Sequence, residues 1–99
     1  MLKGKCYELA YKLVQKLPEA LLVHGKVMGK AKIKGKIHGH AWVELDGIAI
    51  DPAYDLIMPV KEYYALGKVR DETKYNTRDI IKNSLKFKHY GPWNEKEIR

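Results

Sequence analysis

The pattern of apolar positions predicts a helix at the start of the chain. Over residues 5–17, apolar side chains recur every three or four positions, which is the spacing of one face of a helix, and Pro18 ends the segment. This face consists of Cys6, Leu9, Ala10, Leu13, Val14 and Leu17. We therefore expect Cys6 in the first turn of the helix, on the side that packs against the protein.

The next part of the chain has the pattern of extended strands. Apolar runs at 19–27, 39–45 and 48–51 have the length of strands, and Pro52 ends the last of them. Residues 28–36 alternate lysine with small or apolar residues, and we place a hairpin there with the lysines near its tip. These segments predict a helix followed by a three-stranded antiparallel meander.

One turn sets the register of this meander. Asp46-Gly47 between two apolar runs is a strong signal for a tight hairpin turn. The turn pairs Leu45 with Ile48, which places Asp51 diagonal to His40 on the neighbouring strand. Diagonal neighbours lie within reach of long side chains, so we expect these two side chains to meet.

The C-terminal part predicts two short helices. Pro59 and Gly67 bracket a helix at 60–66, residues 67–76 read as a polar loop, and Thr77 is placed to cap a helix that runs to Phe87. The side chains expected to face inward on this last helix are Ile80, Ile81, Ser84 and Leu85. The predicted fold class is α+β: an N-terminal helix packed on a three- to four-stranded antiparallel meander, with two short C-terminal helices.

Length and composition limit the kind of protein. Ninety-nine residues make a single domain, 1–99, with one modest core. The single cysteine excludes an intramolecular disulfide and favours a reducing compartment. No apolar run approaches the roughly 20 residues that span a bilayer, so we expect a cytoplasmic protein with no membrane partner. The lysine-rich, amide-poor composition is typical of a thermophile, although an AT-rich genome produces a similar bias.

The net charge of +7 lies entirely in the first forty residues. They carry nine lysines and two acidic residues, whereas basic and acidic residues balance over 41–99. The excess is concentrated at Lys26, Lys30, Lys32, Lys34 and Lys36. Such a basic hairpin either lies free in solvent or binds nucleic acid weakly, and the chain contains no recognised nucleic-acid-binding motif.

Three residues together carry the candidate chemistry. A thiolate is stabilised in the first turn of a helix, where backbone N–H groups and the helix dipole favour negative charge, so Cys6 is a candidate nucleophile. The His40 imidazole on a facing strand would pair with the thiolate and protonate a leaving amine. The Asp51 carboxylate would fix the tautomer of that imidazole.

Neighbouring residues have weaker signals. His38, Trp42 and Glu44 share the strand face of His40 and are candidates for supporting hydrogen bonds. His38 and His40 could bind a metal only together with a residue such as Cys6 or His89, and the chain has no metal-binding motif. We therefore expect neither a metal nor another cofactor.

The order of these residues resembles a known superfamily. Cysteine on a helix, then H-A-W-V-E on a strand and I-D-P on the next, is similar to the transglutaminase-like branch of the papain-type cysteine proteins. The resemblance covers roughly residues 4–55. It implies Cys6 as nucleophile, His40 as base and acid, Asp51 as orienting group, and a carboxamide of a protein or peptide as substrate. The chain also resembles small phage and archaeal-virus proteins, which implies the host cytoplasm.

Each of the three residues also has a structural interpretation. Cys6 would be a small core side chain, His40 a hydrogen-bonded structural histidine and Asp51 a turn former. Three hypotheses follow: a cysteine-dependent acyl-transfer or amide-hydrolysing protein, a basic nucleic-acid-binding protein, and a non-enzymatic structural or interaction protein. The sequence does not indicate an oligomeric state.

Overall fold

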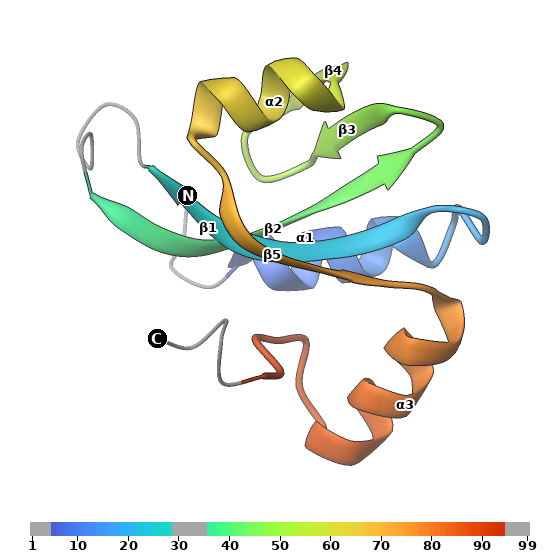
Figure 1. The fold of residues 1–99 in the computed structure, drawn as a ribbon. Helices are drawn as coiled ribbons and strands as arrows, with labels where there is room; N and C mark the ends of the chain where they lie inside the picture. Colours follow the sequence, from blue (N-terminus) through green and yellow to red (C-terminus); the bar gives the residue numbers. More distant parts are fainter. Residues whose placement is uncertain (1–4, 29–35, 95–99) are drawn as a thin grey trace.

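The computed structural model describes residues 5–28 and 36–94 (Figure 1). Its helices are α1 (Lys5–Val14), α2 (Val60–Gly67) and α3 (Thr77–Phe87). Its strands are β1 (Leu21–Met28), β2 (Ile37–Leu45), β3 (Ile48–Asp51), β4 (Leu56–Pro59) and β5 (Arg70–Tyr75). None of the described helices is long and apolar enough to cross a membrane.

The strands form one antiparallel sheet in the order β4-β3-β2-β1-β5. The first four strands are a meander, since each lies beside the next one along the chain. The fifth returns to the open side of β1, so that β4 and β5 are the edge strands and β3, β2 and β1 lie inside the sheet. The α+β class predicted from the sequence is confirmed, and the sheet has five strands rather than three or four.

The predicted hairpin turn is confirmed between β2 and β3. Asp46 and Gly47 have positive φ values of 49° and 79°, as a two-residue turn of this hand requires. Leu45 pairs with Ile48, and the ladder continues to Val43. This register brings the end of β3 to the middle of β2.

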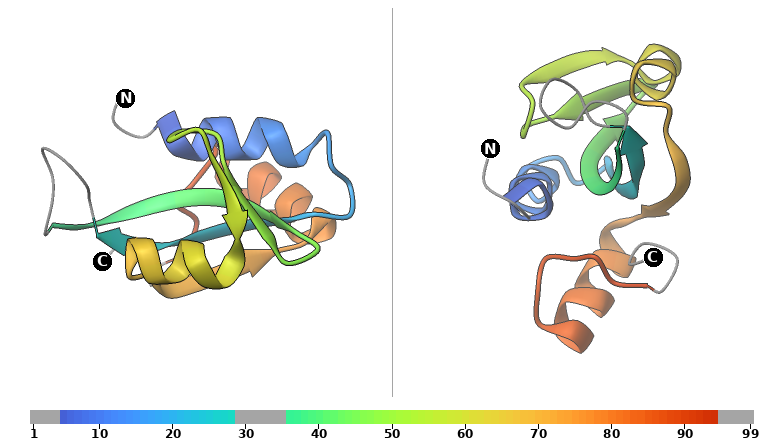
Figure 2. Two further views of the ribbon diagram at one scale, coloured as in Figure 1. Left: turned by 90° about the horizontal axis from the view of Figure 1, so that it is seen from above. Right: turned by 90° about the vertical axis from the view of Figure 1, so that its left-hand side faces the viewer.

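Helices cover both faces of the sheet (Figure 2). On one face, α1 and α3 pack over a cluster that includes Cys6, Ala10, Ala41 and Val43. On the other face, α2 packs over a second cluster that includes Trp42 and Tyr63. The β2 side chains alternate between these two clusters because successive side chains of a strand point to opposite faces.

The first helix is shorter than predicted. It ends at Val14, and the chain tightens through two i to i+3 bonds, Lys16 N to Leu13 O and Leu17 N to Val14 O, both 3.0 Å. Such bonds are common where a helix ends. The apolar spacing over 15–17 therefore matched that of an α-helix although this turn is not α-helical.

The segment predicted as a polar loop contains β5. Its sequence, RDETKY, has no apolar alternation, and Tyr75 is its one buried residue. The strand forms because it completes the hydrogen bonding of β1, with Leu22 opposite Tyr75. Sheet pairing, rather than a buried face, determines this element.

The last helix has the predicted bounds but not the predicted cap or inner face. Asn76, not Thr77, caps it, in a capping box with Asp79. Ile80 is buried as expected, whereas Ile81 and Leu85 are 55% and 72% exposed. The prediction of an inward face was wrong for these two residues, because α3 contacts the sheet through a narrower strip than its apolar pattern covers.

Candidate functional site

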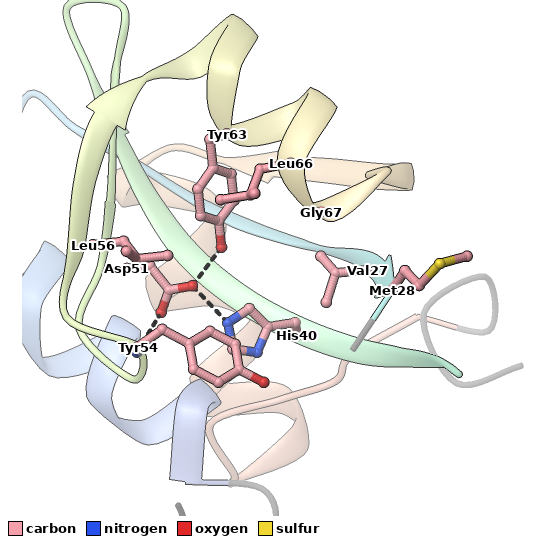
Figure 3. A pocket seen from close by; sticks show the side chains of 9 residues that line it. All are labelled: Val27, Met28, His40, Asp51, Tyr54, Leu56, Tyr63, Leu66 and Gly67. Atoms are coloured by element: carbon pink, nitrogen blue, oxygen red, sulfur yellow. Dashed lines mark hydrogen bonds and ion pairs between the residues drawn. The ribbon is translucent and has the colours of Figure 1, made fainter. Parts of the chain in front are cut away.

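A buried imidazole–carboxylate pair lies where β3 leaves β2 (Figure 3). His40 Nε2 is 2.8 Å from Asp51 Oδ2, and both residues are completely buried. The two side chains meet across adjacent strands, as the turn at Asp46-Gly47 predicts. The sequence therefore identified this pair correctly.

The Asp51 carboxylate is fixed by three further hydrogen bonds. The backbone N–H groups of Ala53 and Tyr54 donate to Oδ1, each at 3.1 Å, which closes the turn after β3. The Tyr63 hydroxyl, from α2, donates to Oδ2 at 2.5 Å. Both oxygens thus have two donors each, and the carboxylate cannot rotate without losing several of them.

Aromatic rings enclose the imidazole. Tyr54 stacks on the His40 ring with a centroid distance of 4.8 Å and an interplanar angle of 26°. Trp42 lies on the same strand face at 6.2 Å and the same angle. The ring plane of His40 is therefore set by packing as well as by its hydrogen bond to Asp51.

The thiol of Cys6 approaches from the first turn of α1. Cys6 is 3% exposed and belongs to the apolar cluster on the face opposite α2. In the described part of the sheet, β3 pairs with β2 only over Val43–Leu45, so no strand neighbours β2 beside His40 on that side. At this edge, side chains from the two faces can meet, and Cys6 interacts with the imidazole of His40.

The site holds a charged imidazole at neutral pH. Burial opposes the charge, but the hydrogen bond to Asp51 and the interaction with Cys6 outweigh it and raise the pKa of His40 to about 9. Burial likewise opposes the charge of Asp51, yet His40, Tyr63 and the Tyr54 N–H lower the pKa of this carboxyl below its ordinary value. The two groups form an imidazolium–carboxylate pair.

One nitrogen of this imidazole is left without a hydrogen bond. Asp51 occupies Nε2, and Nδ1 is buried without a hydrogen-bond partner among the described residues. No hydrogen bond joins Nδ1 to Cys6 in this structure, although the thiol lies near enough to the ring to favour its charge. A protonated Nδ1 beside a thiol can stabilise a thiolate and later donate its proton.

A small cavity adjoins the pair on the side of α2 (Figure 3). Its volume of about 20 Å³ is enough for about one water molecule. Its walls are mostly apolar and consist of Val27, Met28, His40, Asp51, Tyr54, Leu56, Tyr63, Leu66 and Gly67. Cys6 is not among them, so this cavity borders the pair and not the thiol.

The neighbouring residues predicted to support the site divide into two groups. Glu44 does not reach His40. It accepts hydrogen bonds from Trp42 Nε1 at 2.9 Å and the Tyr64 hydroxyl at 2.7 Å, and it pairs with Lys74 at 3.2 Å. Trp42 thus supports Glu44 by hydrogen bonding and His40 only by stacking.

His38 lies closer to the pair. Its ring centroid is 5.9 Å from that of His40, and neither ring nitrogen has a hydrogen-bond partner among the described side chains and backbone. Burial and the neighbouring charge of His40 lower the pKa of His38. Over residues 5–28 and 36–94, no three His, Cys, Asp or Glu side chains are grouped as a metal site.

Most of the lysines of the predicted basic hairpin lie outside the described residues. These are Lys30, Lys32 and Lys34. Lys36 is exposed, and the Lys26 ammonium lies 4.0 Å from the Asp71 carboxylate with its side chain 16% exposed. Nucleic-acid binding by this hairpin stays a prediction.

Sequence reasoning missed both tyrosines of the site. Tyr54 follows the strand end by three residues and Tyr63 belongs to the next helix, so neither shares a strand with His40 or Asp51. A tyrosine buried with its hydroxyl must find a partner, but the sequence does not say which one. The nearness of Tyr54 to the Asp51-Pro52 turn was the one available signal.

Comparison with protein-family models, curated proteins and solved structures finds no match for this chain. What the site can do chemically therefore follows from its own geometry. It has a thiol in the first turn of a helix, an imidazolium with one unbonded N–H, and a carboxylate that orients the ring.

Proposed function

We propose that the protein is a small cysteine-dependent acyl-transfer or amide-hydrolysing enzyme with Cys6, His40 and Asp51 as its catalytic groups. One observation carries the proposal: Asp51 holds Nε2 of a charged imidazole whose Nδ1 is left for the thiol of Cys6. In this arrangement the three groups act in sequence on a single carbonyl. The resemblance of residues 4–55 to transglutaminase-like proteins supports the same assignment.

The reaction would begin with the thiolate of Cys6. It attacks the carbonyl carbon of a carboxamide, and a C–S bond forms while the carbonyl oxygen takes the negative charge. His40 then gives its Nδ1 proton to the amide nitrogen, and the C–N bond breaks to leave a thioester and a free amine. Water or a second amine attacks the thioester, neutral His40 takes a proton from it, and the thiolate of Cys6 leaves.

Access to the thiol requires a displacement of the side chains that cover it. Cys6 and His40 are 3% and 0% exposed, and Tyr54 lies flat against the imidazole. Tyr54 stacks on His40, and we expect its ring to move aside when a substrate carbonyl binds. The class of substrate that this site fits is an exposed side-chain or terminal carboxamide of a protein or peptide, in the cytoplasm of a cell or, for a viral protein, of its host.

The test is the rate at which iodoacetamide alkylates Cys6 near pH 6. A free thiol is roughly 0.3% thiolate at that pH, so a thiolate held by His40 should react about ten- to a hundredfold faster than glutathione. The His40→Gln variant keeps the volume of the side chain but loses the charge, and we expect its rate to fall to that of glutathione or below. Because the chain has one cysteine, intact mass reports this residue alone.

His89→Gln is the matched control, because His89 is an exposed histidine that lies just after the end of α3. It should leave the rate unchanged. Labelling of wild-type Cys6 no faster than glutathione would remove the proposal. Thiol labelling in denaturant verifies that the cysteine is intact in each sample.

A second candidate is a non-enzymatic structural or interaction protein, which the burial of Cys6 among Ala10, Ala41 and Val43 favours. In that case the thiol is a core side chain, so Cys6→Ala should lower the free energy of unfolding through lost packing, and alkylation of the wild type should be slow. Fast, His40-dependent alkylation excludes this candidate.

A further inference from the structure

The two oxygens of the Asp51 carboxylate have different kinds of hydrogen-bond donors. Its Oδ1 accepts only backbone N–H groups, from Ala53 and Tyr54. Its Oδ2 accepts both side-chain donors, His40 Nε2 at 2.8 Å and the Tyr63 hydroxyl at 2.5 Å (Figure 3). The backbone therefore fixes where the carboxylate lies, and the two side chains compete for one of its oxygens.

The Tyr63 side chain is held in place by packing. It is 5% exposed, and its ring lies 5.1 Å from that of Trp42 in the cluster beneath α2. Its hydroxyl points into the cavity at Asp51 rather than to solvent (Figure 3). A short O–H···O bond to a carboxylate is among the stronger hydrogen bonds of proteins and withdraws negative charge from the acceptor.

We propose that Tyr63 is a positioning residue of the acyl-transfer site, which limits the pull of Asp51 on the His40 proton by binding the same carboxylate oxygen. The inference rests on the proposed function. A general acid is most efficient when its pKa lies near the working pH. Tyr63 would thus keep the imidazole able to release its proton to a leaving amine instead of retaining it for Asp51.

The direction of the effect follows from the hydrogen bonds. Tyr63 is one of the groups that lower the pKa of Asp51. Without its hydroxyl, the carboxylate keeps its place through Oδ1 but carries more charge at Oδ2, and it attracts the His40 proton more strongly. Removal of the hydroxyl should therefore raise the pKa of His40.

Several groups face His40 from the elements around it, and each enters the design of the test. They are Cys6 from α1, His38 from β2, Asp51 from β3, Tyr54 from the turn after β3 and, through Asp51, Tyr63 from α2. Changing the first four alters a direct neighbour of the ring. Tyr63→Phe changes one hydroxyl that touches Asp51 and not His40.

The experiment measures the titration of His40 by ¹⁵N–¹H NMR of its imidazole. We expect the Tyr63→Phe variant to raise the pKa of His40 by roughly 0.5–1 unit, a three- to tenfold tighter hold on the proton. Tyr64→Phe is the matched control, because it removes a hydroxyl from the adjacent residue of α2 that binds Glu44. It should leave the titration of His40 unchanged.

An unchanged or lowered pKa of His40 in Tyr63→Phe would overturn the inference. A merely structural role for Tyr63 gives that result, with a lower melting temperature and no change in titration. A second measurement places 3-fluorotyrosine at position 63 alone, so that Tyr54 beside the imidazole is unchanged. Its more acidic hydroxyl donates a stronger hydrogen bond, so the pKa of His40 should fall, and a rise would contradict us even if Tyr63→Phe fails to fold.

This readout separates the inference from the proposed function. The NMR titration needs no reactive thiol. If Cys6 alkylates slowly while Tyr63→Phe shifts His40, the enzyme proposal fails and the effect of Tyr63 on the imidazole stands. If Cys6 reacts rapidly and His40 does not shift, only the role of Tyr63 is wrong.

Discussion

Two buried carboxylates on the α2 face of the sheet are built from nearly the same parts. Each accepts a tyrosine hydroxyl from α2, Tyr63 for Asp51 and Tyr64 for Glu44. Each also lies against a ring nitrogen from β2, belonging to His40 in the first case and to Trp42 in the second. The difference lies in that ring, because an imidazole gains and loses a proton near neutral pH and an indole does not.

The charge of each carboxylate is balanced accordingly. Asp51 is completely buried and has the imidazolium of His40 as its counter-ion, whereas Glu44 is paired with Lys74, whose side chain is 45% exposed. Under the proposed function, the imidazole held by Asp51 supplies the proton for chemistry at Cys6. The Glu44 group is a stable connection between β2, α2 and β5, and we expect it to serve folding alone.

The largest expected effect is that of Asp51→Asn. The substitution keeps the shape but removes a buried charge that has a buried counter-ion, which costs about 4 kcal/mol of the free energy of unfolding. Glu44→Gln is the counterpart at the second carboxylate and should cost about half as much, because its counter-ion is half exposed. Urea unfolding at about pH 7 measures both free energies. Equal losses of stability in the two variants would contradict the difference proposed between the Asp51 and Glu44 groups.

The next effect is the dependence of stability on pH. His40 has a pKa of about 9 in the folded protein and an ordinary value of 6.5 when unfolded. The folded state therefore binds a proton that the unfolded chain releases. The resulting stabilisation is complete below about pH 6.5 and is lost as the pH rises through about 9, and its full size is about 3 kcal/mol.

Urea midpoints between about pH 6 and pH 10 test this dependence. Asp51→Asn should remove most of it, since the imidazole then loses its carboxylate counter-ion, while Glu44→Gln should retain it. Identical slopes in all three proteins would show that His40 does not hold its proton through Asp51.

A smaller effect is expected from Trp42→Phe. The change removes the indole N–H that donates to Glu44 and leaves a space in a completely buried position. Together these cost about 2 kcal/mol. Stability should still be lost over the same pH range as in the wild type, because the hydrogen bond from Asp51, and not Trp42, holds the proton of His40. A shifted midpoint would mean that the two carboxylate groups are coupled through the ring of Trp42.

The smallest effect is that of Lys74→Met, which removes the partly exposed counter-ion of Glu44. Such pairs contribute about 0.5 kcal/mol, and salt weakens them further. The wild type and this variant should therefore converge in stability at about 1 M NaCl. A loss above about 2 kcal/mol would place Lys74 among the essential partners of the buried Glu44.

The sequence predicts those parts of the site that depend on strand register. Asp46-Gly47 determines which residues of β2 and β3 face each other, and the pairing of His40 with Asp51 follows from it. The Cys6 position in α1 follows from helical spacing in the same way. Both are local rules that act over a few residues.

The remaining parts depend on how separate elements are packed together. The helix at 60–66 was predicted, but the direction of its side chains depends on how α2 lies across the sheet, so the Tyr63 contact with Asp51 could not be derived. The strand β5 was missed because its partner, not its own composition, makes it extended. Leu85 was wrongly predicted to face inward, because apolar spacing indicates which side of a helix is apolar but not how much of that side the rest of the protein covers.

Adjacent residues of α2 bind both carboxylates, and this has a consequence for local motion. Tyr63 and Tyr64 must release Asp51 and Glu44 together whenever the helix separates from the sheet. Amide hydrogens of α2 should therefore exchange with solvent deuterium as one cooperative unit. The same opening event would set the fraction of time during which the Asp51 carboxylate binds His40 without the hydrogen bond from the Tyr63 hydroxyl.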